Sequence, residues 1–442
     1  MLRLAVVLVL AMTVFPGLAQ AQEMLALNQA IADAMARNRS LQAARSSAVE
    51  TGFGVQEAKS GLFPRVTVVE SWQRGDQPVF VFSSLLSSRQ FAASNFAIDA
   101  LNHPDPTGFF RTGFGVEQLL FDGGRLGSAR TSAELRRDIA NYSANEAAAD
   151  VALSVADTYG RLLAAQAARR AAESGVESAR EDLKRVERRR DAGMATDADV
   201  LGLRVHAADL EQRAIQASGD AAVARAQLNR LMGAPIGRDY QVAEPPPPAI
   251  GSQSPDNAAL VAEALASRAS LRSSDANARL AEAAQRGARA AFIPQISAQA
   301  GVDVSGLEFS DRTSSWIVGG ELRWTFSTGG ADIARRKAAA EAAARARLQQ
   351  EDTRASVEVE VVTAQRRLEA ARARQAVGLA AVEQARESQR IIRNRFDAGI
   401  AGIDEVLRAS TAVLDAEARR TAAVVDGLVS QAMLDRAVGR IR

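Results

Sequence analysis

Apolar residues recur every three or four positions along most of this chain, which is the spacing of an amphipathic helix. Residues 24–60 follow this spacing, and it resumes from 125 to 190 with few glycines and no proline. At 1.5 Å per residue, the second segment would form a helix roughly 100 Å long. A helix of that length exceeds a compact domain, so we expect it to lie along partners of similar length. A further helix is predicted from 199 to 231.

Four shorter segments are rich in the β-branched, aromatic and alternating residues that are typical of strands. In the clearest one, Trp316, Val318 and Leu322 alternate with Glu321 and Arg323. We expect two β-hairpins, built from strands at about 65–72, 111–121, 295–304 and 315–326. The residues 77–106 inside the first hairpin are predicted to be a loop.

The second half of the chain repeats the first half. Phe63-Pro64 matches Ile293-Pro294 at an offset of 230 residues, and Asp122-Gly123-Gly124 matches Thr328-Gly329-Gly330 at an offset of 206. The first hairpin therefore has 24 additional residues, the difference between 230 and 206. The predicted layout is helix, β-hairpin, very long helix, reversal and helix, and then all of it again.

The repeats define the predicted organisation of the chain. The first repeat spans 22–243, with its hairpin at about 64–122 and its reversal at about 191–199. A proline-rich linker follows at 244–256. The second repeat spans 257–442, with its hairpin at about 294–327 and its reversal at about 397–405.

Each reversal has the same signature. An arginine-rich helix end leads into Ala-Gly, and an acidic residue followed by Val-Leu restarts the helical pattern. Gly193 and Gly399 occupy matching positions, and glycine supplies the positive φ that a helix C-terminus often needs. Thr196 or Asp197 is suited to cap the next helix. Each copy therefore predicts the tip of a helical hairpin.

The first residues predict export. Arg3, the apolar run 4–15 and the segment Ala19-Gln20-Ala21 form a signal peptide at 1–21. No later stretch approaches the roughly 18 consecutive apolar residues of a membrane-spanning helix, so none is expected. The chain has no cysteine, which excludes disulfides.

Composition narrows the functional classes. The 54 basic and 52 acidic residues alternate along helical segments, which favours ion-paired faces over a nucleic-acid surface. His103 and His206 lie in unlike contexts, and there is no phosphate-binding glycine-rich motif. We therefore predict no enzyme, cofactor, catalytic residue or metal site.

Four strands cannot close a barrel, since about eight is the smallest common number. For an exported chain, strands with one apolar face suggest a membrane β-barrel assembled from several chains. Two water-soluble hairpins packed on helix ends fit the alternation equally well. The alternation alone does not choose between them.

The export signal, the duplication, Pro64 and Pro294 before the hairpins, the glycine pairs after them and the twin tips resemble the TolC-like outer-membrane efflux channels. The resemblance covers essentially the whole mature chain. It implies a mainly α fold with a membrane β-barrel portion, in which a duplicated helix–β-hairpin–long helix–helix unit forms a homotrimer. Its 12-stranded β-barrel, surrounded by outer-membrane lipid, would continue as a periplasmic α-helical barrel.

The resemblance also implies a function. The chain would be the outer-membrane exit duct of a tripartite efflux or type I secretion system. It would work with a periplasmic adaptor and an inner-membrane pump of RND or ABC type. The alternatives are a periplasmic adaptor or an extended coiled-coil scaffold, although an adaptor normally has a single hairpin and a lipoyl-like domain.

Two groups of site residues follow from the resemblance. The residues implied to form the periplasmic tips and dock an adaptor are Gly193, Val200, Leu201, Gly399, Val406 and Leu407. Asp199 and Glu405 match the acidic positions of the pore entrance. Arg408 stands where related channels often have a second acidic residue, and Phe396 replaces a tyrosine found in some of them.

Overall fold

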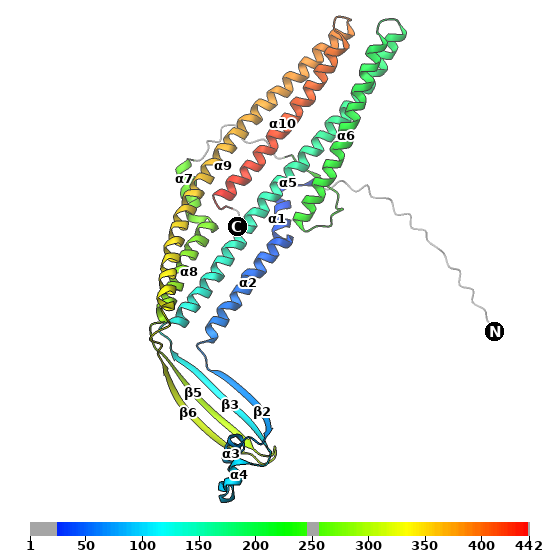
Figure 1. Cartoon of the computed structure of the whole chain (residues 1–442). Helices are drawn as coiled ribbons and strands as arrows, with labels where there is room; N and C mark the ends of the chain where they lie inside the picture. The colour runs from blue at the N-terminus through cyan, green and yellow to red at the C-terminus, as the bar shows by residue number, and fades with distance from the viewer. Residues whose placement is uncertain (1–23, 245–255, 441–442) are drawn as a thin grey trace, which may run out of the picture. The chain divides into compact units, whose positions relative to one another are not determined.

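The computed structural model describes residues 24–244 and 256–440 (Figure 1). The predicted signal peptide and nearly all of the predicted linker lie outside these residues. The described chain divides into two compact units, and each draws on both halves of the sequence. We call residues 24–39, 150–244 and 363–436 the tip unit, and residues 40–149, 256–362 and 437–440 the sheet unit.

The helices of the two halves match in length and position. α2 (Arg39–Ser60) and α8 (Ala269–Ala290) have 22 residues each, and α5 (Arg125–Asp191) and α9 (Ala331–Asp397) have 67 each. Between the members of each pair, the starting positions differ by 230 and 206 residues respectively, the offsets found in the sequence. The duplicated layout is therefore present in the helices on both sides of each β-hairpin.

The helix predicted over 24–60 is broken in the structure. α1 (Leu27–Arg37) stops at Asn38, whose backbone is extended with φ −63° and ψ 122°. The Asn38 side-chain amide donates a 2.8 Å hydrogen bond to the carbonyl of Leu231 on α6 (Asp197–Met232). Because the partner is distant in sequence, helical spacing gives no sign of the break.

One four-stranded antiparallel sheet is formed in the sheet unit. The strands β2 (Arg65–Gly75), β3 (Thr107–Phe121), β5 (Gln295–Gly306) and β6 (Thr313–Arg323) follow in that order. The two predicted hairpins are therefore confirmed, and they pair through β3 and β5. β2 and β6 are the edge strands. The bulge near Leu119 is the one irregularity in the register of β3 and β5.

The two faces of the sheet differ in polarity. Val68, Phe114, Val302 and Trp316 lie side by side across the four strands and are 43–78% exposed. Residues one position away point to the other face, where Arg111 of β3 forms a 2.9 Å ion pair with Asp303 of β5. The predicted pattern of one apolar and one polar face is confirmed.

The segment predicted to be a loop at 77–106 contains three helical elements, so that prediction is wrong. They are α3 (Pro78–Ser87), the 3₁₀ turn η1 (Ala93–Phe96) and α4 (Ile98–Asn102). Proline at the start of α3 favours a helix because it has no N–H to leave unpaired there.

The aromatic rings of this segment pack on one another. Phe91 lies 4.7 Å from Phe82 and 5.0 Å from Phe96, measured between ring centroids. The side chain of Arg89 donates a hydrogen bond to the carbonyl of Ser314 in the second hairpin. These tertiary contacts stabilise the segment, and the mixed polar and apolar sequence does not reveal them.

The tip unit holds a small β-bridge that the sequence did not predict. β1 (Met24–Leu25) pairs in parallel with β4 (Gln241–Val242). The hydroxyl of Tyr159 on α5 lies 2.8 Å from the carbonyl oxygens of both Leu25 and Ala243. Burial raises the pKa of Tyr159 to about 12. The hydroxyl therefore stays protonated and holds both ends of the first repeat against its long helix.

Replacement of Tyr159 by phenylalanine should lower the free energy of unfolding by about 1–2 kcal/mol, because the carbonyls of Leu25 and Ala243 lose the hydroxyl between them. The matched control is Tyr142→Phe, on the part of α5 that lies in the sheet unit, which should change stability much less. Chemical denaturation of the purified protein in detergent measures both. Equal effects of the two substitutions would contradict a stabilising role for the Tyr159 hydroxyl.

Candidate functional site

The twin tips are the candidate functional site, and both reverse the chain at a glycine. Gly193 has φ +76° and Gly399 has φ +77°. At the first tip, Gly193 N–H donates to Arg190 and Met194 N–H donates to Arg189, each at 2.8 Å. The second tip repeats both bonds at the positions 206 residues later. The predicted positive φ and helix reversal are confirmed at both tips.

The first tip has a capping box that the second tip lacks. Thr196 is the N-cap of α6, and its hydroxyl accepts a 3.2 Å hydrogen bond from the N–H of Asp199. In return, the Asp199 carboxylate accepts from the N–H and the hydroxyl of Thr196, both at 2.8 Å. Of the two predicted candidates, Thr196 and Asp197, the cap of α6 is Thr196. At the corresponding position, the second tip has Gly402, which has no side chain for capping.

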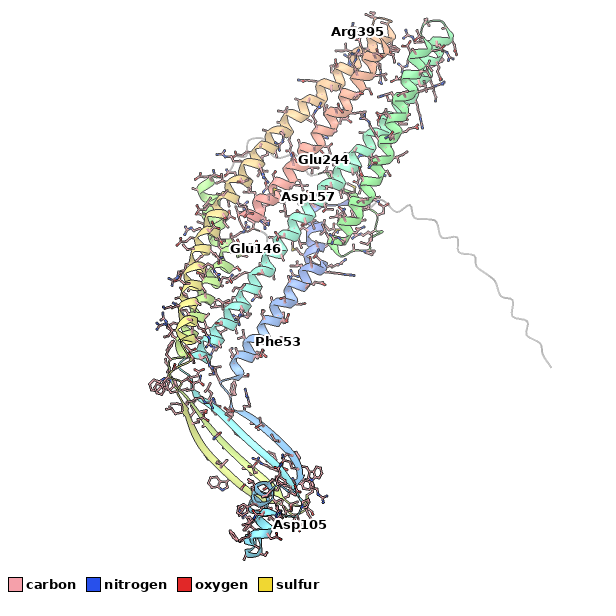
Figure 2. All side chains as sticks on the ribbon, viewed as in Figure 1. Phe53, Asp105, Glu146, Asp157, Glu244 and Arg395 are labelled. Carbon is pink, nitrogen blue, oxygen red and sulfur yellow. The ribbon has the colours of Figure 1, made fainter. Side chains whose placement is uncertain are left out.

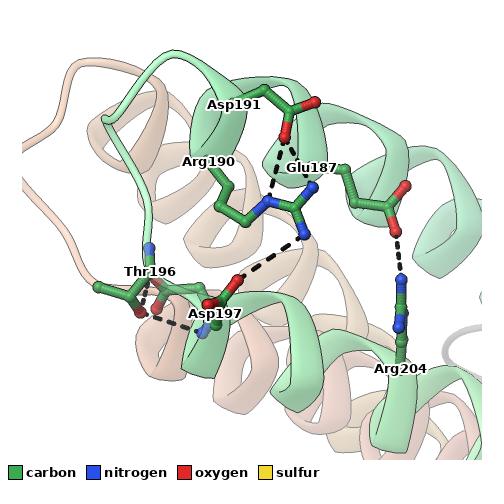
Figure 3. Close-up of polar contacts among 7 residues, drawn as sticks. Glu187, Arg190, Asp191, Thr196, Asp197 and Arg204 are labelled. Atoms are coloured by element: carbon green, nitrogen blue, oxygen red, sulfur yellow. Dashed lines mark hydrogen bonds and ion pairs between the residues drawn. The ribbon is translucent and has the colours of Figure 1, made fainter.

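Ion pairs join α5 to α6 behind the first tip (Figure 3). Arg190 lies 2.6 Å from Asp191 and 3.7 Å from Asp197. One turn further back, Arg204 of α6 pairs with Glu187 of α5 at 2.9 Å. These pairs are solvent-exposed, so each contributes at most about 1 kcal/mol. The pairs Arg190–Asp197 and Glu187–Arg204 join the arginine-rich end of α5 to α6 of the same hairpin.

A second set of contacts joins the two hairpins to each other. The guanidinium of Arg189 on α5 donates a 2.9 Å hydrogen bond to the carbonyl of Phe396 on α9 and lies 4.9 Å from the centre of its ring. Arg393 of α9 contacts Asp182 of α5 at 3.0 Å. Phe396 stands at the position where the resemblance leads one to look for a tyrosine. Its carbonyl and its ring both contact the guanidinium of Arg189.

An apolar cluster lies beneath these polar contacts. Its buried members come from three of the four helices, and they are Val186, Val200, Leu203, Ile403 and Val406. Val200 and Val406, predicted to dock an adaptor, are only 3% and 4% exposed. They pack α6 and α10 (Ile403–Ala437) into this cluster.

The two predicted leucines lie in different surroundings. Leu201 is 59% exposed, whereas Leu407 packs against the buried cluster. Three further apolar side chains at the tips are exposed by 65–71%, namely Met194, Val205 and Ile400. Sequence reasoning missed these three. The spacing of four between Leu201 and Val205 is a signal that could have identified the second of them, since it places both on one helical face.

The predicted pore-entrance residues are not brought into one cluster within a single chain. The carboxylate of Asp199 is engaged in the capping box. Arg408 is exposed, and its Nε donates a 3.2 Å hydrogen bond to the backbone carbonyl of Asp404. No ion pair joins Arg408 to Glu405 among the described residues.

His206 lies on α6 beside this region and is half-buried. Burial lowers the pKa of His206 below its usual value, the charge of Arg213 lowers it further, and the carboxylates of Asp209 and Asp182 partly oppose both effects. The folded protein therefore favours the neutral ring, and the contribution of this group to stability falls as pH drops below about 6.5. Within 24–244 and 256–440, no cluster of His, Cys, Asp or Glu could hold a metal ion.

Replacement of Gly193 by alanine should destabilise the first tip by about 1–2 kcal/mol, because a Cβ atom is strained at φ +76°. The matched control is Gly219→Ala in the interior of α6, where a new Cβ meets nothing within 4 Å. That control should stabilise the helix by about 0.5–1 kcal/mol. Unfolding followed by circular dichroism would show shifts of opposite sign. Shifts of the same sign would refute a conformational requirement at Gly193.

Comparison with known protein families gives a match that covers most of the chain. A model of the family described as "Outer membrane efflux protein" matches residues 30–234 and 260–440. No curated protein gives a significant match. No helix in the described part of the chain has the length and apolar character needed to cross a membrane.

Solved structures share the fold. The CmeC outer membrane channel of Campylobacter jejuni aligns with a TM-score of 0.81 at 16% identity, covering 93% of this chain and 85% of that chain. VceC of Vibrio cholerae aligns with a TM-score of 0.76 at 17% identity, covering 93% and 96%. The open state of MtrE from Neisseria gonorrhoeae gives 0.75 at 19% identity, covering 93% and 88%.

Proposed function

Because the chain belongs to the outer membrane efflux protein family, we propose that three copies form a passive exit duct served by a periplasmic adaptor and an inner-membrane pump. The predicted TolC-like membership is confirmed, and the chain is an outer-membrane efflux channel that extends into the periplasm. Family members are trimers that work with such partners. The identity of the pump, RND or ABC type, is part of the proposal.

The open sheet is the observation that most supports the trimer. Four strands leave β2 and β6 as edges, and unpaired backbone groups are costly in lipid. β2 runs away from the helices, and β6 runs back toward them, so β6 of one copy can pair with β2 of the next in antiparallel fashion. Three copies would supply 12 strands. Neither the family match nor the solved structures favour the alternatives of an adaptor or a scaffold.

The absence of enzymatic activity is also part of the proposal. The family is one of channels. The charged residues of the helices are largely paired along exposed faces, for example Arg386 with Glu417 and Arg180 with Glu211, each at 2.6 Å. Residues paired in this way do not converge on a reacting centre. The driving force would come from the pump.

Adaptor docking is assigned to the exposed part of the tips. Leu201 and Val205 present apolar surface on α6, and Met194 and Ile400 do so at the two reversals. The positive φ of Gly193 and Gly399 forms the two reversals at which Met194 and Ile400 lie. Val200 and Val406 would act indirectly, by fixing the position of the helices that carry this surface.

The full chain, expressed with its leader, should appear in the outer-membrane fraction as a trimer that resists detergent and separates into monomers on heating. The control is a soluble periplasmic protein followed through the same fractionation. Recovery of this chain as a monomer in the periplasmic fraction would refute the proposed duct.

A second prediction concerns ion preference at the tips. A trimer would repeat Asp199, Glu405 and Arg408 as rings, and charged rings determine which ions enter a channel. Arg408→Asp should increase cation preference, and Glu405→Ala should decrease it, in reversal potentials measured on single channels in a bilayer.

Two further substitutions separate the effect of charge at the entrance from an effect on folding. Arg408→Lys keeps the charge and should leave the reversal potential unchanged. Asp199→Ala should also cost about 1 kcal/mol of stability, because it removes half of the capping box. If neither Arg408→Asp nor Glu405→Ala changes the reversal potential, these residues do not line the entrance.

A further inference from the structure

The first β-hairpin carries a helical segment that the second one lacks. Residues 76–106 join β2 to β3 and contain α3, η1 and α4, whereas residues 307–312 join β5 to β6 and contain no helix. We call residues 76–106 the insertion, because they include the 24 additional residues of the first hairpin. Figure 2 shows the side chains of the insertion, with Asp105 among them, at the end of the sheet away from α2 and α8.

α3 packs on the polar face of the sheet. At its start, the ring of Phe80 lies edge-on to the ring of Phe109 on β3, with 6.4 Å between the ring centres. At its end, the carbonyl of its last residue accepts a 3.2 Å hydrogen bond from the hydroxyl of Ser305 on β5. Each of these two strand residues lies two positions from a member of the Arg111–Asp303 ion pair. Because alternate residues of a strand share a face, α3 covers the face that carries this pair.

α3 runs across the strands and is held at both ends. Two residues separate its start from the end of β2. Just beyond its end, the guanidinium of Arg89 donates a 3.1 Å hydrogen bond to the carbonyl of Ser314 on β6. The amide of Gln90 donates a 2.8 Å hydrogen bond to the carboxylate of Asp311 in the turn of the second hairpin. α3 is therefore a fixed element that bridges the two hairpins, not a mobile lid.

The two sides of α3 have different surroundings. Val81, Ser84 and Ser88 follow one another along the covered side and are 5%, 2% and 6% exposed. Val79 and Leu86 lie on the opposite side by helical spacing, and they are 82% and 50% exposed. α3 therefore presents apolar side chains to the space around it.

The position of α3 becomes significant when the sheet is part of a barrel. In a membrane barrel the apolar face meets lipid and the other face lines the interior. The polar face, with α3 on it, would therefore line the bore of the proposed trimer. The helices of an efflux channel extend into the periplasm, so the insertion lies at the opposite, outer end of the bore.

The dimensions of such a barrel leave little room for these helices. The wall of a 12-stranded barrel, with strands about 4.8 Å apart and tilted by about 40°, lies roughly 12 Å from the barrel axis. A helix with its side chains is about 10 Å thick, so three α3 helices on this wall would fill most of the outer mouth. Further along the polar face stand Gly113, Gly301 and Gly319, which leave the bore open. The narrowest part of the bore within the sheet unit is then at α3.

We propose that the three α3 helices of the trimer form a fixed constriction at the outer mouth, which admits small solutes and excludes bulky ones from the bore. Val79 and Leu86 of each copy line this passage with apolar groups. The inference rests on the proposed exit duct and specifies its cargo, which is small molecules with apolar surface and not secreted proteins.

Thiol labelling of intact cells tests the constriction, since the chain has no cysteine of its own. Gln299 is exposed on the polar face of β5, about 20 Å closer to the helices than Ser305. Gln299→Cys should react with a small anionic methanethiosulfonate added outside the cells. It should not react with a bulky polyethylene glycol maleimide, because α3 blocks the path of that reagent.

A variant without the insertion provides the comparison. Replacing residues 76–106 with the sequence of residues 306–312 removes the 24 additional residues and gives the first hairpin the turn of the second. In this variant the bulky maleimide should also label Gln299→Cys. Equal exclusion of the bulky reagent with and without the insertion would overturn the proposal.

Val79→Cys tests the same constriction without shortening the chain. Because Val79 is exposed in the single chain, its replacement should not prevent folding. In the trimer, the new thiol should react with the small reagent only. The matched control is Glu308→Cys, at an exposed position in the turn of the second hairpin, which should react with both reagents. Equal reaction of the bulky reagent at the two positions would place α3 outside the bore and contradict the constriction.

A position on the apolar face separates this proposal from the exit duct itself. Val318 of β6 lies beside Ala300 on that face, and Val318→Cys should react with neither reagent because lipid covers it. If the bulky reagent reaches Gln299→Cys in a heat-resistant trimer of the full chain, the constriction is wrong and the exit duct stands. If the small reagent labels Val318→Cys and leaves Gln299→Cys unlabelled, the polar face lines no bore and the exit duct is refuted.

Discussion

The backbone hydrogen bonds at the edges of the sheet are the constraint on which the rest of the structure depends. A four-stranded sheet ends in β2 and β6, and lipid offers no partner for their outer N–H and C=O groups. The apolar face across Val68, Phe114, Val302 and Trp316 is equally unsuited to water. Other copies that extend the sheet inside a membrane satisfy both features together.

Part of this architecture could be predicted from the sequence because its causes are local. Glycine at positive φ, proline before a strand and period-two alternation act over a few residues, and they identified both tips and all four main strands. The duplication gives each element the same signal twice, as at Gly193 and Gly399. The break at Asn38 and the helix at Pro78–Ser87 escaped prediction because distant partners stabilise them, Leu231 in one case and the second hairpin in the other.

The tips show the same limit in the candidate site. The Val-Leu pair after each reversal correctly located the first turn of the following helix. Two adjacent apolar residues did not, however, indicate which of them faces the interior. In the structure Val200 and Val406 are core residues, and exposure falls instead on Leu201, Val205, Met194 and Ile400. The Arg189–Phe396 contact joins residues 207 apart in sequence. Such a link depends on how two hairpins pack, which no local pattern contains.

The two repeats have diverged most clearly in how they stabilise their matching helix breaks. Asn38 and Arg268 occupy matching helix breaks, and both side chains donate to matching carbonyls, those of Leu231 and Ala437. Arg268, however, is 5% exposed, and its guanidinium also lies 2.9 Å from Glu360 and 3.4 Å from Glu146. A buried charge is costly without its partners, so Arg268 ties α8 to α5 within one chain. Asn38 has no charge of this kind to bury. The first repeat therefore holds the same helix break without burying a charge at that position.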